Sequence, residues 1–573
     1  MKIKKLFLVA AVASFATLAL AAEDCGDCGT ADSCKDGCTT SQNLWQPHAF
    51  SVSMSREGIL QKAAWESKTD DSWFGTFGVG FEYMQNFGEA KDCSAEKSCC
   101  QSLGAMPFWA SDKSNVMTIG NNSGTYDLDA YQMGLGPVTT TGTVRLDPRV
   151  FQTGGDFFLY FGANKTERSF FAKIHGAVGV MSINPKLSFS EGLVPVDYPA
   201  NALNGTNSTT ATEGVAAPYE NISEAFEGNK TAGYLKKMNY GKIQCKQTTS
   251  AKFGDLAIAV GYNVYADEKK HLGLALRFTA PTGNKANAEY VLEPLWGRNG
   301  HWAAGGELIG HWRAWESDSS DNYLDLWIDA TAEHLFRSKH MRSFDLKLNG
   351  PGSKYLLVAK YTGGVSATFQ NCIENAINIT TLPVETSFAA EGNFVAMLDF
   401  HFNSWNLALG YEGWGRTCED IQIDCKCPGS INLNDYAVLG RQTRGGQDGE
   451  TAGMTSVAGQ DDLCEPAAKI GKSEDRYFPT ATITSSTFPT STGIADATDP
   501  ANRIPEDLND AVDICGQRAH KAYTSKAFVQ VGHTWKDSDY APYLGLVGAA
   551  EYSHTDNSAV KFWTIGVQGG LAF

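Results

Sequence analysis

The chain has 573 residues and a net charge of −17 at pH 7, with 58 glycines, 11% aromatic residues and only 19% charged residues. Beyond its N-terminus it contains no run of about twenty apolar residues, which excludes a bundle of membrane-spanning helices. A membrane β-barrel is not excluded by this test, because its strands are apolar only at alternate positions.

The first 21 residues have the pattern of a secretory signal peptide. Three lysines stand within the first five residues, an apolar run extends from Leu6 to Leu20, and the small residues Ala19 and Ala21 mark a cleavage site. A buried helix or a membrane span would also be apolar, but this run is short for a span and its flanks fit cleavage. We therefore expect residues 1–21 to be removed, and the loss of three lysines takes the net charge from −17 to −20.

Residues 22–72 are predicted to form a cysteine-rich N-terminal segment. Cys25 and Cys28 lie in its first part, and the helix-prone stretch SREGILQKAAWE in its second part is expected to add a plug to the domain that follows. The 14 cysteines of the chain all follow the signal peptide, and an even number in an oxidising compartment favours disulfides. A zinc site is the alternative, because Cys25 and Cys28 have zinc-knuckle spacing, but the other spacings are irregular and no histidine is close.

Strands with alternating apolar and polar residues occupy most of the remaining chain. The stretch 256–264 alternates, is interrupted by the charged tip ADEKK, and resumes alternation over 272–280. The stretch 393–412 repeats this hairpin around the tight turn Asn403-Ser404. Such alternation is typical of strands with one face in lipid, although a sandwich of two packed sheets alternates in the same way.

The connections between these strands fall into two length classes. Those at 266–270 and 403–404 are short, whereas those near 184–236 and 413–525 are long and rich in Thr, Ser, Gly, Asn and Asp. Short periplasmic turns and long extracellular loops are typical of outer-membrane barrels. The sequence therefore predicts an all-β fold in which residues 73–573 form an antiparallel transmembrane β-barrel.

We count about fourteen candidate strands, and the pattern leaves twelve to sixteen open. The candidates are 73–83, 126–136, 157–163, 170–183, 256–264, 272–280, 302–315, 324–335, 355–361, 393–402, 405–412, 527–535, 543–552 and 561–573. If the two short turns lie on the same side of the membrane, the number of candidates between them is inconsistent. We place the missing or surplus crossing between residues 337 and 391.

The C-terminal strand, KFWTIGVQGGLAF, carries the sharpest motif. Trp563, Ile565, Val567, Leu571 and Phe573 would share one face, with small or polar residues on the other. Together with the signal peptide and the period-two strands, the closing VQGGLAF resembles bacterial outer-membrane β-barrel proteins. The resemblance implies that Phe573 and Leu571 form a signal read by the barrel-assembly machinery, and that the barrel lies in the lipid of the bacterial outer membrane.

The cysteine-rich N-terminal segment carries a second resemblance, which rests on composition. It is similar to the cross-linked major porins of chlamydia-like bacteria. The resemblance implies a homo-oligomer or disulfide cross-linking between chains.

The opposite face of each strand would face the barrel interior. We expect nine side chains to line a pore: Lys173, His175, Arg277, Glu307, Arg313, Asp325, Asp329, Asp399 and His401. The same alternation points Asp255, His311, Glu333 and Glu412 inward. Charges of both signs are typical of a porin that selects small polar solutes. The alternative is that these groups form a salt-bridged filling that closes a structural barrel.

These features predict a channel for passive diffusion of small solutes. One alternative is a transporter of hydrophobic compounds resembling the long-chain fatty-acid transporter family, favoured if the N-terminal segment lies inside the barrel. Another is a structural or adhesive surface barrel, favoured if the long loops dominate and the lumen is closed. No GxSxG elbow or phosphate-binding loop is present, so we expect no enzyme activity, cofactor, metal or nucleic-acid partner. An embedded hydrolase would need a nucleophile and a base that face a common cleft.

Overall fold

The structure is a computed structural model that describes the chain in segments. The described residues are 43–46, 48–66, 73–87, 116–120, 127–136, 138, 140–190, 193–195, 197, 216–244, 246–267, 269–319, 321–347, 349–361, 369–424, 435–438, 511–519, 521–536, 540–554 and 561–573. The predicted signal peptide, the four cysteines before residue 43 and most of the loop 413–525 lie outside the described residues.

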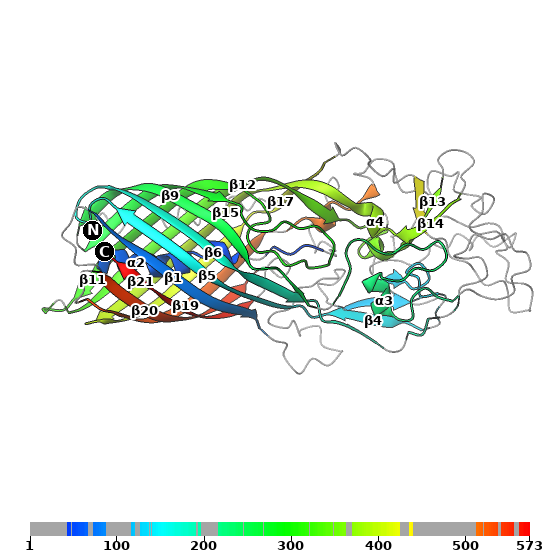
Figure 1. Cartoon of the computed structure of the whole chain (residues 1–573), viewed down its shortest axis with the longest axis horizontal. Coiled ribbons are helices and arrows are strands. Elements are labelled where there is room, and N and C mark those ends of the chain that lie inside the picture. Colours follow the sequence, from blue (N-terminus) through cyan, green and yellow to red (C-terminus); the bar gives the residue numbers. More distant parts are fainter. Residues whose placement is uncertain are drawn as a thin grey trace, which may run out of the picture.

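Twelve strands form a closed antiparallel barrel (Figure 1). They are β1 (Phe74–Asn86), β5 (Arg149–Gly162), β6 (Phe170–Asn184), β9 (Lys252–Asp267), β10 (Lys270–Ala280), β11 (Ala303–Glu316), β12 (Asn322–Ser343), β15 (Thr381–Phe402), β16 (Trp405–Arg416), β19 (Ala522–Thr534), β20 (Ala541–Ser553) and β21 (Phe562–Ala572). Each pairs with its neighbour in chain order, and the first pairs with the last, so the ring has no open edge. The predicted antiparallel barrel is confirmed, and twelve strands lie within the predicted range.

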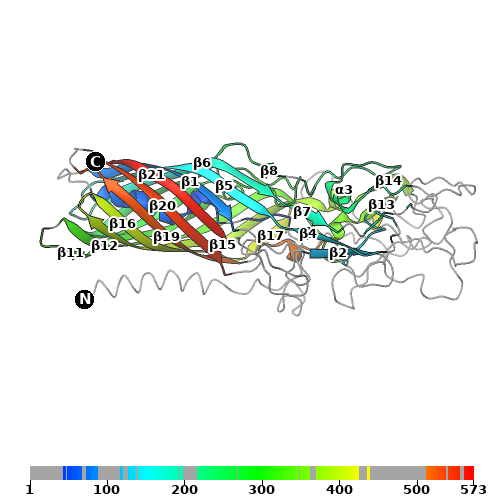
Figure 2. The same cartoon turned by 90° about the horizontal axis from the view of Figure 1, so that it is seen from below.

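Two further strands join the barrel sheet outside the ring. They are β8 (Gln247–Thr248), which pairs with β6, and β17 (Glu419–Ile423), which pairs with β15. Both extend the wall at the end of the barrel that carries the long connections (Figure 2).

The predicted strand 355–361 is the surplus crossing in the sequence-based count. It overlaps β13 (Leu357–Tyr361), which pairs with β14 (Phe369–Asn375) and β18 (Tyr436–Val438) in a separate sheet. Its residues 357–359 are buried in succession, the pattern of a strand covered on both faces. Four strands, β10, β11, β12 and β15, then separate the two short turns, so the error lies within the interval that we predicted.

The predicted strand 126–136 also lies outside the barrel. It contains only β3 (Leu128–Asp129), which belongs to a four-stranded sheet with β2 (Val116–Gly120), β4 (Gly142–Leu146) and β7 (Leu187–Phe189). This sheet is built from the connections that precede and follow the hairpin of β5 and β6. Twelve of the fourteen predicted strands therefore correspond to barrel strands.

The long connections gather at one end of the barrel. The first strand of the ring, β1, begins at the other end, and the last strand, β21, finishes there (Figures 1 and 2). At the loop end, the two small sheets pack with four short helices: η2 (Ser353–Tyr355), η6 (Cys515–Gln517), α3 (Ile222–Glu227) and α4 (Ile377–Thr380). A continuous apolar core joins these elements through residues such as Met117, Phe226, Tyr355 and Ile373. The barrel thus has a turn end and a folded loop end, the asymmetry predicted from connection lengths.

The outer face of the wall is apolar along its length. Leu274, Leu276 and Phe278 of β10 are each more than half exposed, as are Leu544 and Leu546 of β20. Exposed tryptophans stand near strand ends, at positions 73, 302, 315 and 405. An apolar band bordered by aromatic residues is the surface that a barrel presents to a bilayer. None of the helices in the described part of the chain is long and apolar enough to cross a membrane.

Candidate functional site

The described residues of the stretch 43–66 (43–46 and 48–66), which we call the lumen segment, lie inside the barrel. The segment passes through η1 (Phe50–Val52) and continues as α2 (Met54–Glu66). The helix contacts β1, β5 and β21 on one side of the ring and β12, β15 and β16 on the other, and the wall surrounds it in Figures 1 and 2. The side chains from Met54 to Trp65 are all buried, so α2 has no solvent face.

The lumen segment runs from the loop end to the turn end of the barrel. At the loop end, the Asn43 amide N–H donates to Oε1 of Gln517 at 3.3 Å, and His48 stacks on Trp414 with ring centroids 4.9 Å apart. At the turn end, Trp65 packs edge-on against Phe74, the first residue of β1, at 4.9 Å. The segment therefore spans much of the barrel interior.

A wall carboxylate fixes the start of α2. Glu412 of β16 accepts the Met54 amide N–H at 2.7 Å through Oε1, and the hydroxyls of Ser53 and Ser55 donate to Oε2 at 3.0 and 2.7 Å. The Lys526 ammonium lies 3.1 Å from the same carboxylate. An anion at a helix N-terminus satisfies free N–H groups and complements the helix dipole. The wall thus supplies an acceptor and a negative charge at the start of the helix.

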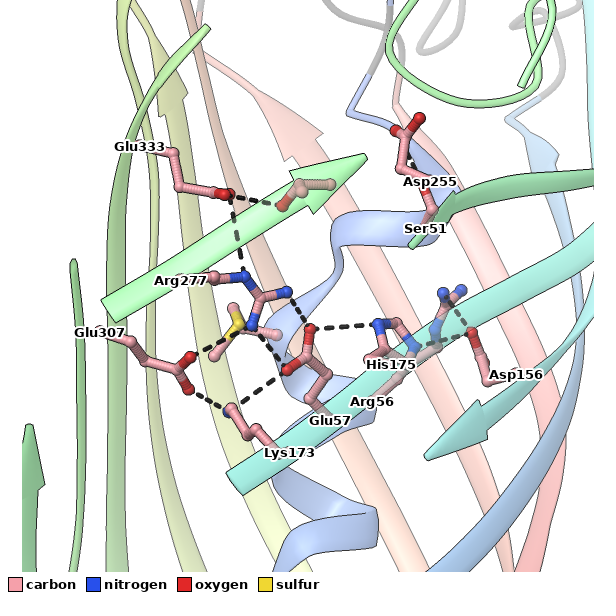
Figure 3. Close-up of polar contacts among 12 residues, drawn as sticks. Ser51, Arg56, Glu57, Asp156, Lys173, His175, Asp255, Arg277, Glu307 and Glu333 are labelled. Carbon is pink, nitrogen blue, oxygen red and sulfur yellow. Dashed lines mark hydrogen bonds and ion pairs between the residues drawn. The ribbon is translucent and has the colours of Figure 1, made fainter. Parts of the chain in front are cut away.

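The largest polar contact between helix and wall surrounds Glu57 (Figure 3). Its two carboxylate oxygens accept from Arg277, at 2.5 Å for Nη2 to Oε1 and 2.9 Å for Nη1 to Oε2. Lys173 Nζ lies 3.3 Å from Oε2, and His175 Nδ1 lies 3.1 Å from Oε1. Glu307 contacts Arg277 at 3.3 Å and also contacts Lys173. We call these five residues the Glu57 cluster.

Arg56 pairs with β5 and β1, the wall strands next to the Glu57 cluster. Its Nη2 donates to Oδ1 of Asp156 at 2.8 Å, and its Nη1 lies 3.6 Å from Oε2 of Glu82. The guanidinium also packs over the Phe50 ring, 3.6 Å from the centroid, and donates to the Phe50 carbonyl. The helix therefore presents a cation and an anion at successive positions, each to wall groups of opposite charge.

Lys62 makes the third charged contact between helix and wall. Its Nζ lies 2.9 Å from Oδ2 of Asp399 and donates to Oε1 of Gln530 at 2.9 Å. His401 Nε2 lies 2.8 Å from the same Asp399 oxygen, and Asn406 donates to the other oxygen at 2.9 Å. Buried charges persist only when they are paired and hydrogen-bonded, and both conditions are met here.

The connection between β10 and β11, at the loop end, covers the N-terminal part of the lumen segment. Trp296, in residues 281–302, is buried against Phe50 with ring centroids 4.9 Å apart. Arg298 of the same connection lies 3.1 Å from Glu391 and 3.2 Å from Glu333, both on the wall. The Arg298 amide N–H donates to Asp255 at 2.9 Å. Residues of this connection thus form a second layer against the start of the lumen segment.

The turn end of the lumen segment is held by rings rather than charges. Trp65 stacks on His271 with centroids 3.9 Å apart and planes inclined by 6°. His271 contacts His311 through their Nδ1 atoms, and His311 stacks on Trp327 at 4.7 Å. The histidines come from paired positions on β10 and β11. The two ends of α2 are therefore held by different chemistry.

The residues predicted to line a pore do face the barrel interior. Eight of the nine are buried: Lys173, His175, Arg277, Glu307, Asp325, Asp329, Asp399 and His401. Arg313 is partly buried and pairs with Asp325 at 3.0 Å. The four further inward positions are buried as well: Asp255, His311, Glu333 and Glu412. Their part in conduction stays a prediction.

Sequence reasoning missed the helix charges that meet these wall residues. Arg56, Glu57 and Lys62 stand in the stretch that we expected to be helical, but nothing in that stretch indicated their partners. A weak signal was present, because the stretch has neither a clear apolar stripe nor a continuous polar face. Such a helix suits an interior that is itself both apolar and charged.

The C-terminal strand closes the ring as its pattern predicts. Leu571 and Ile565 are exposed on the outer face, whereas Thr564 and Gln568 on the other face are buried. Phe573 exchanges two backbone hydrogen bonds with Gly75 of β1, at 2.8 and 3.0 Å. The role of Phe573 and Leu571 as an assembly signal stays a prediction.

Few of the cysteines fall within the described residues. Cys372 is a buried free thiol whose pKa is raised by burial, and Cys418 and Cys515 are disulfide-bonded. Disulfide bonding of the remaining cysteines stays a prediction. In the described part of the chain, no group of three or more His, Cys, Asp or Glu side chains is placed to hold a metal ion. Cys25 and Cys28, the candidate zinc ligands, lie outside it.

No protein-family model matches the chain, and no curated protein is similar to it in sequence. Among solved structures, an outer membrane channel of Pseudomonas putida F1 aligns over 87% of this chain and 96% of its own, at 9% identity and a TM-score of 0.31. The Pseudomonas putida toluene transporter TodX aligns over 93% and 96%, at 8% identity and 0.29. A Pseudomonas aeruginosa FadL homologue aligns over 88% and 90%, at 8% identity and 0.22.

The architecture itself is that of a bacterial outer-membrane β-barrel. The antiparallel ring is closed, the outer face is apolar, and the connections are short at one end and long at the other. In a closed barrel the backbone N–H and C=O groups of every strand are hydrogen-bonded within the ring, which is the condition for spanning lipid with β-structure.

Proposed function

We propose that the protein is an outer-membrane channel that the lumen segment closes at rest. The observation that carries this proposal is the position of α2, whose charged side chains are paired with the wall across the lumen. In an open porin the inward charges face water. Here Lys173 is 2% exposed and Asp399 is fully buried. Solutes can pass only if the lumen segment moves.

The contacts of the lumen segment are compatible with such movement. Within the described residues, none of the barrel strands pairs with residues 43–66 as a strand partner. The segment is held by ion pairs, side-chain hydrogen bonds and stacked rings. It can therefore leave its position without breaking the ladder hydrogen bonds of the wall, which supports a gated channel over a permanently open pore.

A transporter of hydrophobic compounds is the second candidate. An N-terminal segment inside the barrel favours it, as the sequence-based alternative specified. The charged lumen favours polar solutes instead, because an apolar solute beside Asp399 or Glu307 would displace polar partners and offer none in return. Binding and permeation experiments can separate these two solute classes.

Loosening the Glu57 cluster tests the gate. The change Glu57→Gln keeps the side-chain shape but removes the anion that faces Arg277, Lys173 and His175. Breaking a buried pair costs about 3 kcal/mol, which would raise the population of the open state about a hundredfold. In planar bilayers we expect rare openings from the unmodified full chain and frequent openings from the variant.

The matched control is Glu220→Gln, which removes an exposed carboxylate at the loop end. Glu220 pairs with Lys230 at 3.5 Å and is largely exposed, so openings should be unchanged. Steady conduction by the unmodified chain, unaltered by Glu57→Gln, would overturn the proposed gating.

Liposome swelling by small sugars through the Glu57→Gln variant would favour polar solutes. Saturable binding of a long-chain fatty acid without swelling would favour the second candidate.

A further inference from the structure

We propose that the lumen, once the lumen segment has moved aside, selects cations, and that its solutes are small organic cations with an ammonium or guanidinium group. This inference rests on the proposed channel function and extends it by naming a solute class. It is carried by the charges of the wall and by what the helix places against them.

The inner face of the wall is strongly acidic. The buried acidic side chains on the twelve barrel strands number eleven: Glu82, Asp156, Asp255, Glu307, Asp325, Asp329, Glu333, Glu391, Asp399, Glu412 and Glu551. The buried basic side chains on these strands number five: Lys173, Arg277, Arg342, Arg416 and Lys526. With histidines neutral the net charge is −6, and it is still −4 when Arg298 and the partly buried Arg313 are included.

The basic groups of the wall keep partners when the helix leaves. Arg277 loses Glu57 but retains Glu307 at 3.3 Å and Glu333 at 3.8 Å. Lys173 likewise retains Glu307. The departure of Glu57 therefore exposes no unpaired cation that would attract anions.

The acidic groups of the wall do lose cations. Arg56 withdraws from Asp156 and Glu82, and Lys62 withdraws from Asp399. Asp399 is then left with one histidine and one neutral amide as its close partners. The helix thus places a guanidinium and an ammonium in two wall sites that a solute cation could occupy after it.

A third wall carboxylate, that of Asp329, faces α2 but pairs with no cation of this helix. Asp329 is 1% exposed, and its Oδ1 has no hydrogen-bond partner. Its Oδ2 would lie 2.9 Å from a Cβ placed on Gly58, so the helix backbone approaches this carboxylate closely only because residue 58 is glycine. A buried carboxylate with a free oxygen is costly, and a passing cation would satisfy it.

Together these positions give the lumen an acidic lining. Asp399 lies on β15, Asp329 on β12 and Asp156 on β5, so the anions are distributed around the ring. Rings of acidic side chains select cations in channels, and a cleft of one charge sign raises the local concentration of counter-ions. The cations of α2 are the occupants of this lining in the closed state.

The experiment uses the full chain carrying Glu57→Gln, so that the channel is open. Reversal potentials under a KCl gradient should give a K⁺ to Cl⁻ permeability ratio of about five or more. Adding Asp399→Asn or Asp156→Asn should each lower this ratio about twofold. Adding the exposed Glu220→Gln should not. A ratio of one or below, or a ratio that neither asparagine variant changes, would overturn the inference.

A binding measurement keeps the inference testable if no variant conducts. Calorimetry on the detergent-folded Glu57→Gln chain, in about 0.15 M salt to screen surface charge, would compare spermidine with citrate. We expect spermidine to bind about tenfold more tightly than citrate, and Asp399→Asn to weaken only spermidine. Equal binding of the two ions would overturn the cation preference. Absence of current in all variants, with spermidine binding intact, would count against the channel function and leave the cation sites standing.

Discussion

The outer and inner faces of the barrel wall follow opposite rules, and adjacent residues of β10 show the contrast. Leu276 is 65% exposed and points to lipid, whereas Arg277 is 2% exposed and pairs with Glu57 inside the lumen. The outer face needs only apolar surface, because lipid accepts any such side chain. The inner face needs specific partners, because each buried charge must find an opposite charge at the correct distance.

The comparison teaches that tolerance to substitution should differ between the two faces. Outer positions should accept any apolar residue and reject charge. Inner positions should reject even neutral replacements of similar size, because these leave a partner charge unpaired in a buried site.

The largest effect is expected on the inner face, from Arg277→Met. The change leaves Glu57, Glu307 and Glu333 without their shared guanidinium, and loss of one member of a buried pair costs about 3–5 kcal/mol. Urea unfolding of the refolded protein in lipid vesicles measures the loss. As a matched control, Arg337→Met removes a half-exposed arginine that lies 3.1 Å from Asp420, and exposed pairs contribute about 0–1 kcal/mol. Equal losses of stability from the two changes would contradict the expected difference between the inner face and an exposed ion pair.

A somewhat smaller effect is expected on the outer face, from Leu276→Arg. An arginine facing lipid near the bilayer midplane costs about 2–4 kcal/mol, and less near the interfaces. The same urea titration reports it, with Leu276→Phe as the apolar control. Wild-type stability of Leu276→Arg would mean that β10 does not face lipid at this position.

The smallest effect is expected at the loop end, where Glu419 of β17 provides a titratable ion pair outside the ring. Burial acts to raise the pKa of Glu419, but the Arg342 guanidinium, 2.8 Å away, and the Ala519 amide N–H outweigh it and lower the pKa to about 2. A depressed carboxyl pKa contributes stability that is complete above the unfolded pKa and is lost as the pH falls through the folded value.

The loop end should therefore keep its stability down to about pH 4.5 and lose about 1–3 kcal/mol between there and pH 2. Urea titrations of the wild type and of Glu419→Gln, repeated over this range, test the expectation. The difference in stability between the two proteins should shrink toward zero at the acid end. A difference that is constant from pH 7 to pH 2 would contradict it.

Much of the wall could be predicted from the sequence alone. Twelve of the candidate strands lie in the ring, and the inward residues from Lys173 to His401 are buried apart from Arg313. This succeeded because alternation is a property of neighbouring residues: side chains at successive positions of a strand point to opposite faces wherever the strand lies. The same local reasoning failed for 355–361, where β13 has the β-propensity of a barrel strand but belongs to a sheet covered on both faces.

Which charges pair across the lumen was decided only by the tertiary structure. The pair between Glu57 and Arg277 joins residues 220 positions apart, and the pair between Lys62 and Gln530 joins residues 468 positions apart. No local periodicity encodes such a partner, because a charge in a short helix can be satisfied by water, by its own helix or by a distant wall. The sequence alone determined which faces of the strands are apolar and which are charged. Only closure of the ring around α2 decided that the charges meet a helix instead of water, because ring closure brings strands from across the chain within ion-pair distance of one segment.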